Sequence, residues 1–108
     1  KIDNGYLREY NLGLKRKVLY LENTLAKSQK ISFVSPKGSF FAFLNIGKSG
    51  LSSDKFATEL LRKKGVAVTP GSAFGANWDD HIRVSMALDY DEFAEGIDLI
   101  YEFCADNL

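Results

Sequence analysis

The first part of the chain carries apolar residues at the spacing of a single helix face. They follow one another at intervals of seven, four, three and four residues: Leu7, Leu14, Val18, Leu21 and Leu25. This is the period of an amphipathic helix whose apolar side faces a core. We therefore predict one long helix within residues 1–30.

The next two apolar segments are predicted to be the strands of a hairpin. Residues 31–34 and 39–46 flank the sequence Ser35-Pro36-Lys37-Gly38, whose proline and glycine suit a type I turn. Strand alternation leaves the second segment apolar on both faces, with Phe41 and Phe43 on one and Phe40, Ala42, Leu44 and Ile46 on the other. We expect this strand to be covered on both sides, or to lie against something outside the chain.

A second helix and a short strand follow. Ser52 or Ser53 can cap the start of the helix, and Gly65 is placed to end it. Phe56 and Leu60 mark its apolar face. Residues 66–69 then form a short strand, which is interrupted by the dipeptide Pro70-Gly71.

The last strand and the last helix have the clearest patterns. In residues 82–88, the side chains predicted to face inward are Ile82, Val84, Met86 and Leu88. The opposite face of this strand carries His81, Arg83, Ser85 and Ala87. The final helix opens with Asp89 and Glu92 at the spacing of a capping box. Its predicted buried face carries Phe93, Ile97, Ile100 and Cys104.

The order of elements is therefore helix, strand, strand, helix, strand, strand, helix. Such an order is typical of an α+β domain in which helices cover one face of a small, mostly antiparallel sheet. We predict about four strands in that sheet, and the length of 108 residues fits one domain.

Composition and charge exclude several classes of function. Lys plus Arg equals Asp plus Glu at 14 each, so no net charge attracts nucleic acid or an anionic membrane. The single cysteine, Cys104, excludes an internal disulfide and a cysteine-built metal site. No segment reaches the roughly 18 to 20 apolar residues that span a bilayer, and no signal peptide opens the chain. We expect a cytoplasmic protein and, because the chain begins on a lysine, a piece of a longer one.

Three further motifs fail on inspection. The tripeptide Gly47-Lys48-Ser49 resembles the end of a P-loop, but Ala42 stands where the earlier glycine should be. The consecutive residues Asp79-Asp80-His81 are poorly spaced to converge on one metal ion. The aromatic cluster at residues 40–43 lacks the flanking basic residues of an RNA-binding strand. We therefore predict neither a metal site nor a nucleic-acid site.

Arg83 is the residue with the most specific chemistry. It lies in the middle of a predicted strand, on the face opposite the core and beside Ser85. The ordinary interpretation of such a residue is an arginine on a solvated strand face. However, a guanidinium group can also hold a carboxylate through two parallel hydrogen bonds.

Four segments, taken in order, resemble the class I and II aminotransferases. Pro36-Lys37-Gly38-Ser39-Phe40-Phe41 is similar to the Pro-x-Gly-x-Phe-Tyr turn and strand of that family. Residues 56–75, with Pro70-Gly71 and Phe74-Gly75, resemble its most readable C-terminal signature, and Ile82-Arg83-Val84-Ser85 resembles its Arg-hydrophobic-Ser strand. An acidic amphipathic final helix follows. The resemblance covers about residues 31–108 and is to the C-terminal small domain of a fold-type I, pyridoxal-phosphate-dependent aminotransferase.

The resemblance implies roles for particular residues. Arg83 would bind the α-carboxylate of an amino acid or 2-keto acid, Phe40 would border the substrate, and Gly38 would lie near the mouth of the pocket. Residues 1–30 would link this small domain, residues 31–108, to a large domain. The full-length enzyme would use pyridoxal 5'-phosphate and form a homodimer.

The chain also departs from the family pattern. Lys15-Arg16-Lys17 stands where the family often has Arg-Arg-Asp, and Phe41 replaces the commoner tyrosine. The cofactor-lysine motif is absent, so we expect this chain to contain no catalytic residue and to bind no cofactor covalently. Two alternatives stay open: the same domain in a pyridoxal-phosphate C–S or β-lyase, and a free-standing α+β interaction module.

Overall fold

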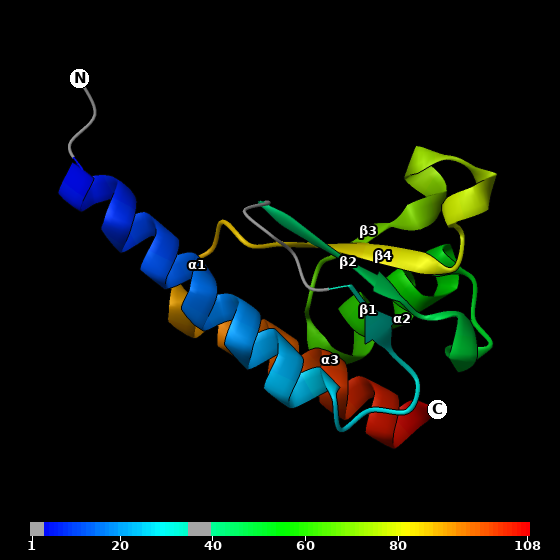
Figure 1. Ribbon diagram of the computed structural model, residues 1–108. Helices are drawn as coiled ribbons and strands as arrows, with labels where there is room; N and C mark the ends of the chain where they lie inside the picture. The colour runs from blue at the N-terminus through cyan, green and yellow to red at the C-terminus, as the bar shows by residue number, and fades with distance from the viewer. Residues whose placement is uncertain (1–3, 35–39) are drawn as a thin grey trace.

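Three α-helices cover one face of a four-stranded sheet in the residues that the structure describes (Figure 1). This computed structural model describes residues 4–34 and 40–108, with side chains from residue 12 onward. The predicted turn at residues 35–38, with Gly38, and the side chain of Leu7 lie outside the described residues. The predicted α+β class, with a small antiparallel sheet under helices, is confirmed.

The strands pair in the order β1-β2-β4-β3, and every neighbouring pair is antiparallel. Their bounds are β1 Ser32–Phe33, β2 Phe41–Asn45, β3 Thr69–Pro70 and β4 His81–Ser85. The predicted strand at residues 66–69 begins only at Thr69, because pairing with β4 starts where Thr69 lies opposite Arg83. Pro70 is tolerated there because β3 is an edge strand of the sheet.

The helices begin and end largely where their capping residues predicted. Their bounds are α1 Asn4–Leu25, α2 Ser53–Lys64 and α3 Tyr90–Asn107. The Ser52 side chain accepts the first hydrogen bond of α2, and Gly65 ends this helix with a left-handed φ of 71°. The Asp89 carboxylate accepts the backbone N–H of Glu92 at 2.9 Å at the start of α3. These three caps are confirmed, and Ser52, not Ser53, caps α2.

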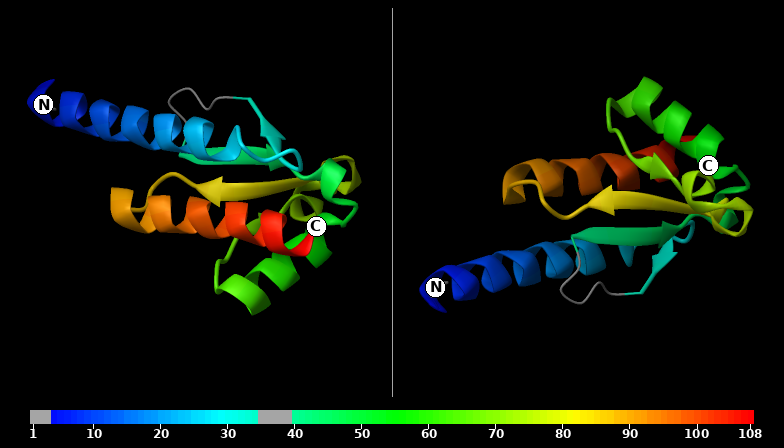
Figure 2. Two further views of the ribbon diagram at one scale, coloured as in Figure 1. Left: turned by 90° about the horizontal axis from the view of Figure 1, so that it is seen from below. Right: turned by 90° about the horizontal axis from the view of Figure 1, so that it is seen from above.

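The core lies between the helices and one face of the sheet (Figure 2). The two views show α1 and α3 running side by side in the same direction along the sheet. All four residues predicted for the buried face of α3 are buried, and Phe103 joins them. The ring of Phe103 meets that of Phe56 edge-to-face at a centroid distance of 5.1 Å. Leu21 and Leu25 of α1 are fully buried, as the apolar spacing predicted.

One inward-facing residue was predicted wrongly. Leu88 is 41% exposed, because β4 ends at Ser85 and strand alternation ends with it. The Ser85 hydroxyl accepts the backbone N–H of Ala87 and turns the chain toward α3. Met86, immediately after the strand, is buried as predicted.

Cys104 is a small buried hydrophobic residue, as its place in the helix pattern predicted. Burial raises the pKa of its thiol to about 11, so the thiol is protonated at neutral pH.

Within the described ranges, no helix combines the length and the apolar character needed to cross a membrane.

Gly71 stands where two backbone segments come closest together. A Cβ atom at this position would lie 1.8 Å from the carbonyl oxygen of Trp78 and 2.6 Å from that of His81. Because both obstacles are backbone atoms, a side chain there must displace the whole loop between them. Only glycine fits this approach.

We predict that Gly71→Ala lowers the free energy of unfolding by about 3 kcal/mol, the upper part of the range for overpacking. Urea denaturation followed by circular dichroism measures this loss. Gly96→Ala is the matched control, because a Cβ at Gly96 in α3 meets no atom within 4 Å. That variant should gain roughly 0.5 to 1 kcal/mol from its helix propensity. Equal stability of the two variants would contradict the close approach at Gly71.

Candidate functional site

The face of the sheet opposite the helices carries the side chains that could contact a ligand. Strand alternation in β2 and β4 buries one set of side chains and turns the other away from the core. The register places Phe43 opposite Arg83, Phe41 opposite Ser85 and Asn45 opposite His81. Because these pairs share one face, they form a continuous row across the middle of the sheet. Figure 2 shows that the helices lie on the other face.

Arg83 is held between aromatic rings on this open face. Its Cζ atom lies 4.1 Å from the centroid of the Phe41 ring and 4.8 Å from that of Phe74. These are cation–π distances, and such contacts contribute about 0.5 to 1 kcal/mol at partly exposed sites. The side chain is half-buried, so the ordinary interpretation of a fully solvated arginine does not apply.

The charge of Arg83 has no anionic partner among the residues that the structure describes, since no carboxylate there lies within ion-pair distance of it. The aromatic rings occupy the faces of the planar guanidinium. Its N–H donors lie in the plane, so they stay available to a ligand that approaches the edge.

Phe74 and Trp78 complete an aromatic surface over the strands. They come from two short 3-10 helices, η2 Gly71–Phe74 and η3 Ala76–Trp78. The Phe43 ring centroid lies 6.0 Å from that of Phe74 and 5.6 Å from that of Trp78. We call Phe41, Phe43, Phe74 and Trp78 the aromatic face; each of these side chains is between 38% and 42% exposed. The face of β2 that carries Phe41 and Phe43 is therefore only partly covered by the described residues.

A groove of about 550 Å³ runs beside the aromatic face on the β1 side of the sheet. Its lining residues are Ser32, Phe33, Val34, Phe41, Phe43, Asn45, Trp78 and His81. The groove is apolar along most of its wall, with an amide and an imidazole at one end.

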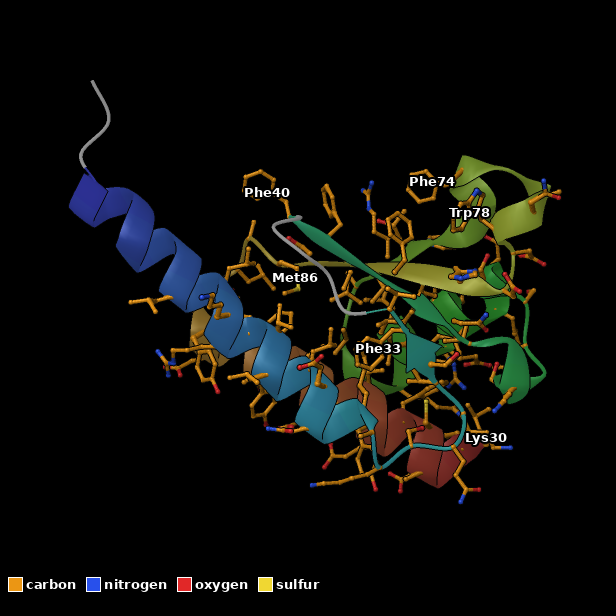
Figure 3. The ribbon with its side chains drawn as sticks, viewed as in Figure 1. Lys30, Phe33, Phe40, Phe74, Trp78 and Met86 are labelled. Carbon is orange, nitrogen blue, oxygen red and sulfur yellow. The ribbon has the colours of Figure 1, made fainter. Side chains whose placement is uncertain are left out.

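Phe40 lies at the near edge of this open face. It is 55% exposed, and Figure 3 shows its ring on the same side of the sheet as Phe74 and Trp78, away from the helices. The prediction that Phe40 points to the same face of the strand as Ala42 is therefore wrong. Phe40 precedes the first residue of β2, so strand alternation does not reach it. The structure thus places Phe40 and Arg83 on one side of the sheet, whereas Gly38 lies outside the described residues.

A buried polar network, which sequence reasoning missed, holds η2 and η3 in place. The Ser53 hydroxyl is fully buried; it donates to the Asp79 carboxylate at 2.9 Å and accepts the backbone N–H of Ser72 at 3.0 Å. The Ser53 N–H also donates to the backbone oxygen of Asp79 at 2.8 Å. The only available signal was a second serine next to the helix cap, and such a serine usually faces solvent.

The acidic residues near β4 have structural partners. Asp79 turns toward Ser53, while Asp80 pairs with the His81 imidazole at 2.7 Å. Within the described part of the chain, no group of three acidic, histidine or cysteine side chains is placed to hold a metal ion.

Comparison with known proteins identifies the family of the chain. The family described as "Aminotransferase class I and II" matches residues 1–100 of the chain. The chain belongs to the class I and II aminotransferase family. This aminotransferase family depends on pyridoxal phosphate, and the resemblance drawn from the sequence motifs is confirmed.

Individual relatives agree with this assignment. The aspartate aminotransferase of Pyrococcus horikoshii is 38% identical over 93 residues, which cover 86% of this chain and 23% of that protein. The crystal structure of the aromatic aminotransferase from the same organism matches with a TM-score of 0.86 at 29% identity, over 94% of this chain and 27% of that one. The chain therefore spans about a quarter of the length of these aminotransferases. Because the relatives are aminotransferases, the lyase alternative is not favoured.

A cofactor-holding lysine is not part of the described strands β2 and β4 or of η2 and η3. A Schiff base with this cofactor needs the primary amine of a lysine. The described strands β2 and β4 and the helices η2 and η3 contain no lysine. These elements thus offer a guanidinium cation with aromatic neighbours and no primary amine.

We predict that Ser53→Ala loosens η2 and η3, because it leaves the Asp79 carboxylate and the Ser72 N–H without their buried partner. The expected loss of stability is about 1 to 3 kcal/mol. Trp78 is the single tryptophan of the chain, so its fluorescence reports the loop directly. We expect the emission to shift to longer wavelength.

Ser52→Ala is the matched control for this variant. It removes the cap of α2, which is worth about 1 kcal/mol, because the Ser52 hydroxyl accepts the backbone N–H of Lys55 within that helix. Stability should fall while the Trp78 emission stays unchanged. If both variants shift the emission equally, the network does not position the loop.

Proposed function

We propose that this domain binds the α-carboxylate of amino acid and 2-keto acid substrates in a pyridoxal-phosphate-dependent aminotransferase, with Arg83 as the carboxylate ligand. The proposal rests on the burial and the contacts of the Arg83 side chain. Its guanidinium is half-buried, lies against the rings of Phe41 and Phe74, and has no carboxylate partner among the described residues. A substrate carboxylate supplies the missing partner.

The geometry gives Arg83 more than a charge. Two parallel hydrogen bonds to a carboxylate fix its plane, and therefore the direction of the bond to Cα. The aromatic neighbours displace water from around the ion pair, which strengthens the Coulomb attraction. Arg83 would thus act through binding and orientation of the substrate.

The electron sink of this reaction class is pyridoxal phosphate. Since β2, β4, η2 and η3 carry no lysine, we assign the cofactor to the large domain of a longer enzyme. We propose that residues 31–108 form the C-terminal small domain and that residues 1–30 link it to the large domain. The exposed aromatic face supports a position of the large domain opposite Arg83. A homodimer of the full-length enzyme is part of the same proposal.

Phe40 and Gly38 complete the proposed substrate site. The exposed ring of Phe40, on the same side of the sheet as Arg83, supports a position beside the substrate. The role of Gly38 at the mouth of the pocket rests on the family resemblance of its turn.

We predict that, in the full-length enzyme, Arg83→Lys raises the KM for the amino acid and lowers kcat/KM by about 10- to 100-fold. A lysine keeps the charge but loses the two-point contact, and hydrogen bonds to charged groups are worth about 1.5 to 3 kcal/mol. Steady-state kinetics measures the change. Arg62→Lys is the control, because Arg62 pairs with Glu59 on the surface of α2. Unchanged kinetics for Arg83→Lys would remove this residue from the site.

A second prediction concerns the 108-residue chain alone. Mixed with pyridoxal phosphate, an amino acid and a 2-keto acid, it should show no amino-group transfer above the rate of free cofactor. The physical reason is that, in the described part of the open face, β2, β4, η2 and η3 carry no lysine for the cofactor. A coupled assay for the product keto acid measures this, and turnover above background would overturn the assignment of the cofactor to the large domain.

A further inference from the structure

A lysine of α1 donates hydrogen bonds to the segment that follows β4, the strand that carries Arg83. The Lys17 ammonium group donates to the backbone carbonyl of Met86 at 2.9 Å and also to that of Leu88. These residues join the end of β4 to the start of α3, about 70 positions away in the chain. Figure 3 shows Met86 between α1 and the sheet.

Met86 is the point at which three elements meet. Its backbone N–H donates to the carbonyl oxygen of Phe40 at 2.6 Å, and its own carbonyl accepts from Lys17. Phe40 immediately precedes β2, and Arg83 lies three residues before Met86 on β4. The hydrogen bonds of Lys17 thus connect α1, through Met86, to the end of β4 and the start of β2. Arg83 lies on β4, and Phe40 lies just before β2.

Two other polar contacts of α1 are of a different kind. The Tyr20 hydroxyl donates to Asp98, and the Cζ atom of Arg16 lies 4.1 Å from the centroid of the Tyr90 ring. These side chains tie one helix to another at the surface. Lys17 instead donates to backbone carbonyls just after β4, the strand that carries Arg83.

We infer that Lys17 is a positioning residue for the substrate carboxylate. By fixing the exit of β4 against α1, it sets the position of Arg83 and makes the linking helix and the carboxylate-binding strand move as one body. This inference rests on the proposed function of Arg83.

Lys17→Met tests the inference in the full-length enzyme. It keeps most of the aliphatic chain and removes the donors, so that the carbonyls of Met86 and Leu88 lose their partner. Two ligands are compared: the amino acid substrate, through its KM, and the amine with the same side chain but no carboxylate, through its inhibition constant. We expect the KM to rise about tenfold and the inhibition constant of the amine to stay unchanged.

Two further variants separate positioning from general damage. Lys15→Met removes an exposed lysine from the same helix and should change neither constant. Lys17→Arg keeps a charged donor, so it should recover most of the affinity for the amino acid and keep the domain folded where the methionine variant does not. A lower melting temperature with an unchanged KM would make Lys17 a purely structural residue and overturn the inference. Equal losses for the amino acid and the amine would overturn it as well.

Arg83→Lys, measured in the same series, distinguishes failure of the inference from failure of the proposed function. If it leaves the KM unchanged, the proposed role of Arg83 is wrong. If it raises the KM while Lys17→Met does not, only the role of Lys17 is wrong.

Discussion

The antiparallel pairing of β2 with β4 is the constraint on which the rest of this domain depends. Each strand sends alternate side chains to opposite faces, so one register decides both what is buried and what is presented. When Phe43 lies opposite Arg83, the buried pairs Ala42–Val84 and Leu44–Ile82 face the helices. A slip of one residue would bury the guanidinium and expose the core. The same pairing therefore maintains stability and places the candidate carboxylate ligand.

The position of Arg83 also depends on a loop that contributes no strand to the sheet. Phe74 lies against the guanidinium only because η2 and η3 fold back over the open face. That fold needs a glycine at position 71, where backbone atoms leave no room for a side chain, and the buried hydroxyl of Ser53. Gly71 and Ser53 thus control the surroundings of Arg83, because they determine where Phe74 lies.

In the function that we propose, the open face is one half of a substrate site. It combines one cation, several partly exposed aromatic rings and a groove, and the domain spans about a quarter of the length of its relatives. Apolar surface of this kind is costly unless another surface covers it. In the enzyme that we propose, the large domain covers it and brings the cofactor, while α1 and the bonds of Lys17 carry any movement of the small domain to Arg83.

Local chemistry made most of the fold readable from the sequence, and tertiary contacts decided the rest. Helix caps such as Ser52, Gly65 and Asp89, and the period of the apolar residues, depend on neighbours within one turn, so the elements and the α+β class followed from the sequence alone. The family motifs also singled out Arg83. Its aromatic neighbours, the exposure of Phe40 and the bonds of Lys17 join residues far apart in the chain, which local spacing cannot place. Only the folded sheet brings them together, because its register and its end points are set by all the elements that pack on it.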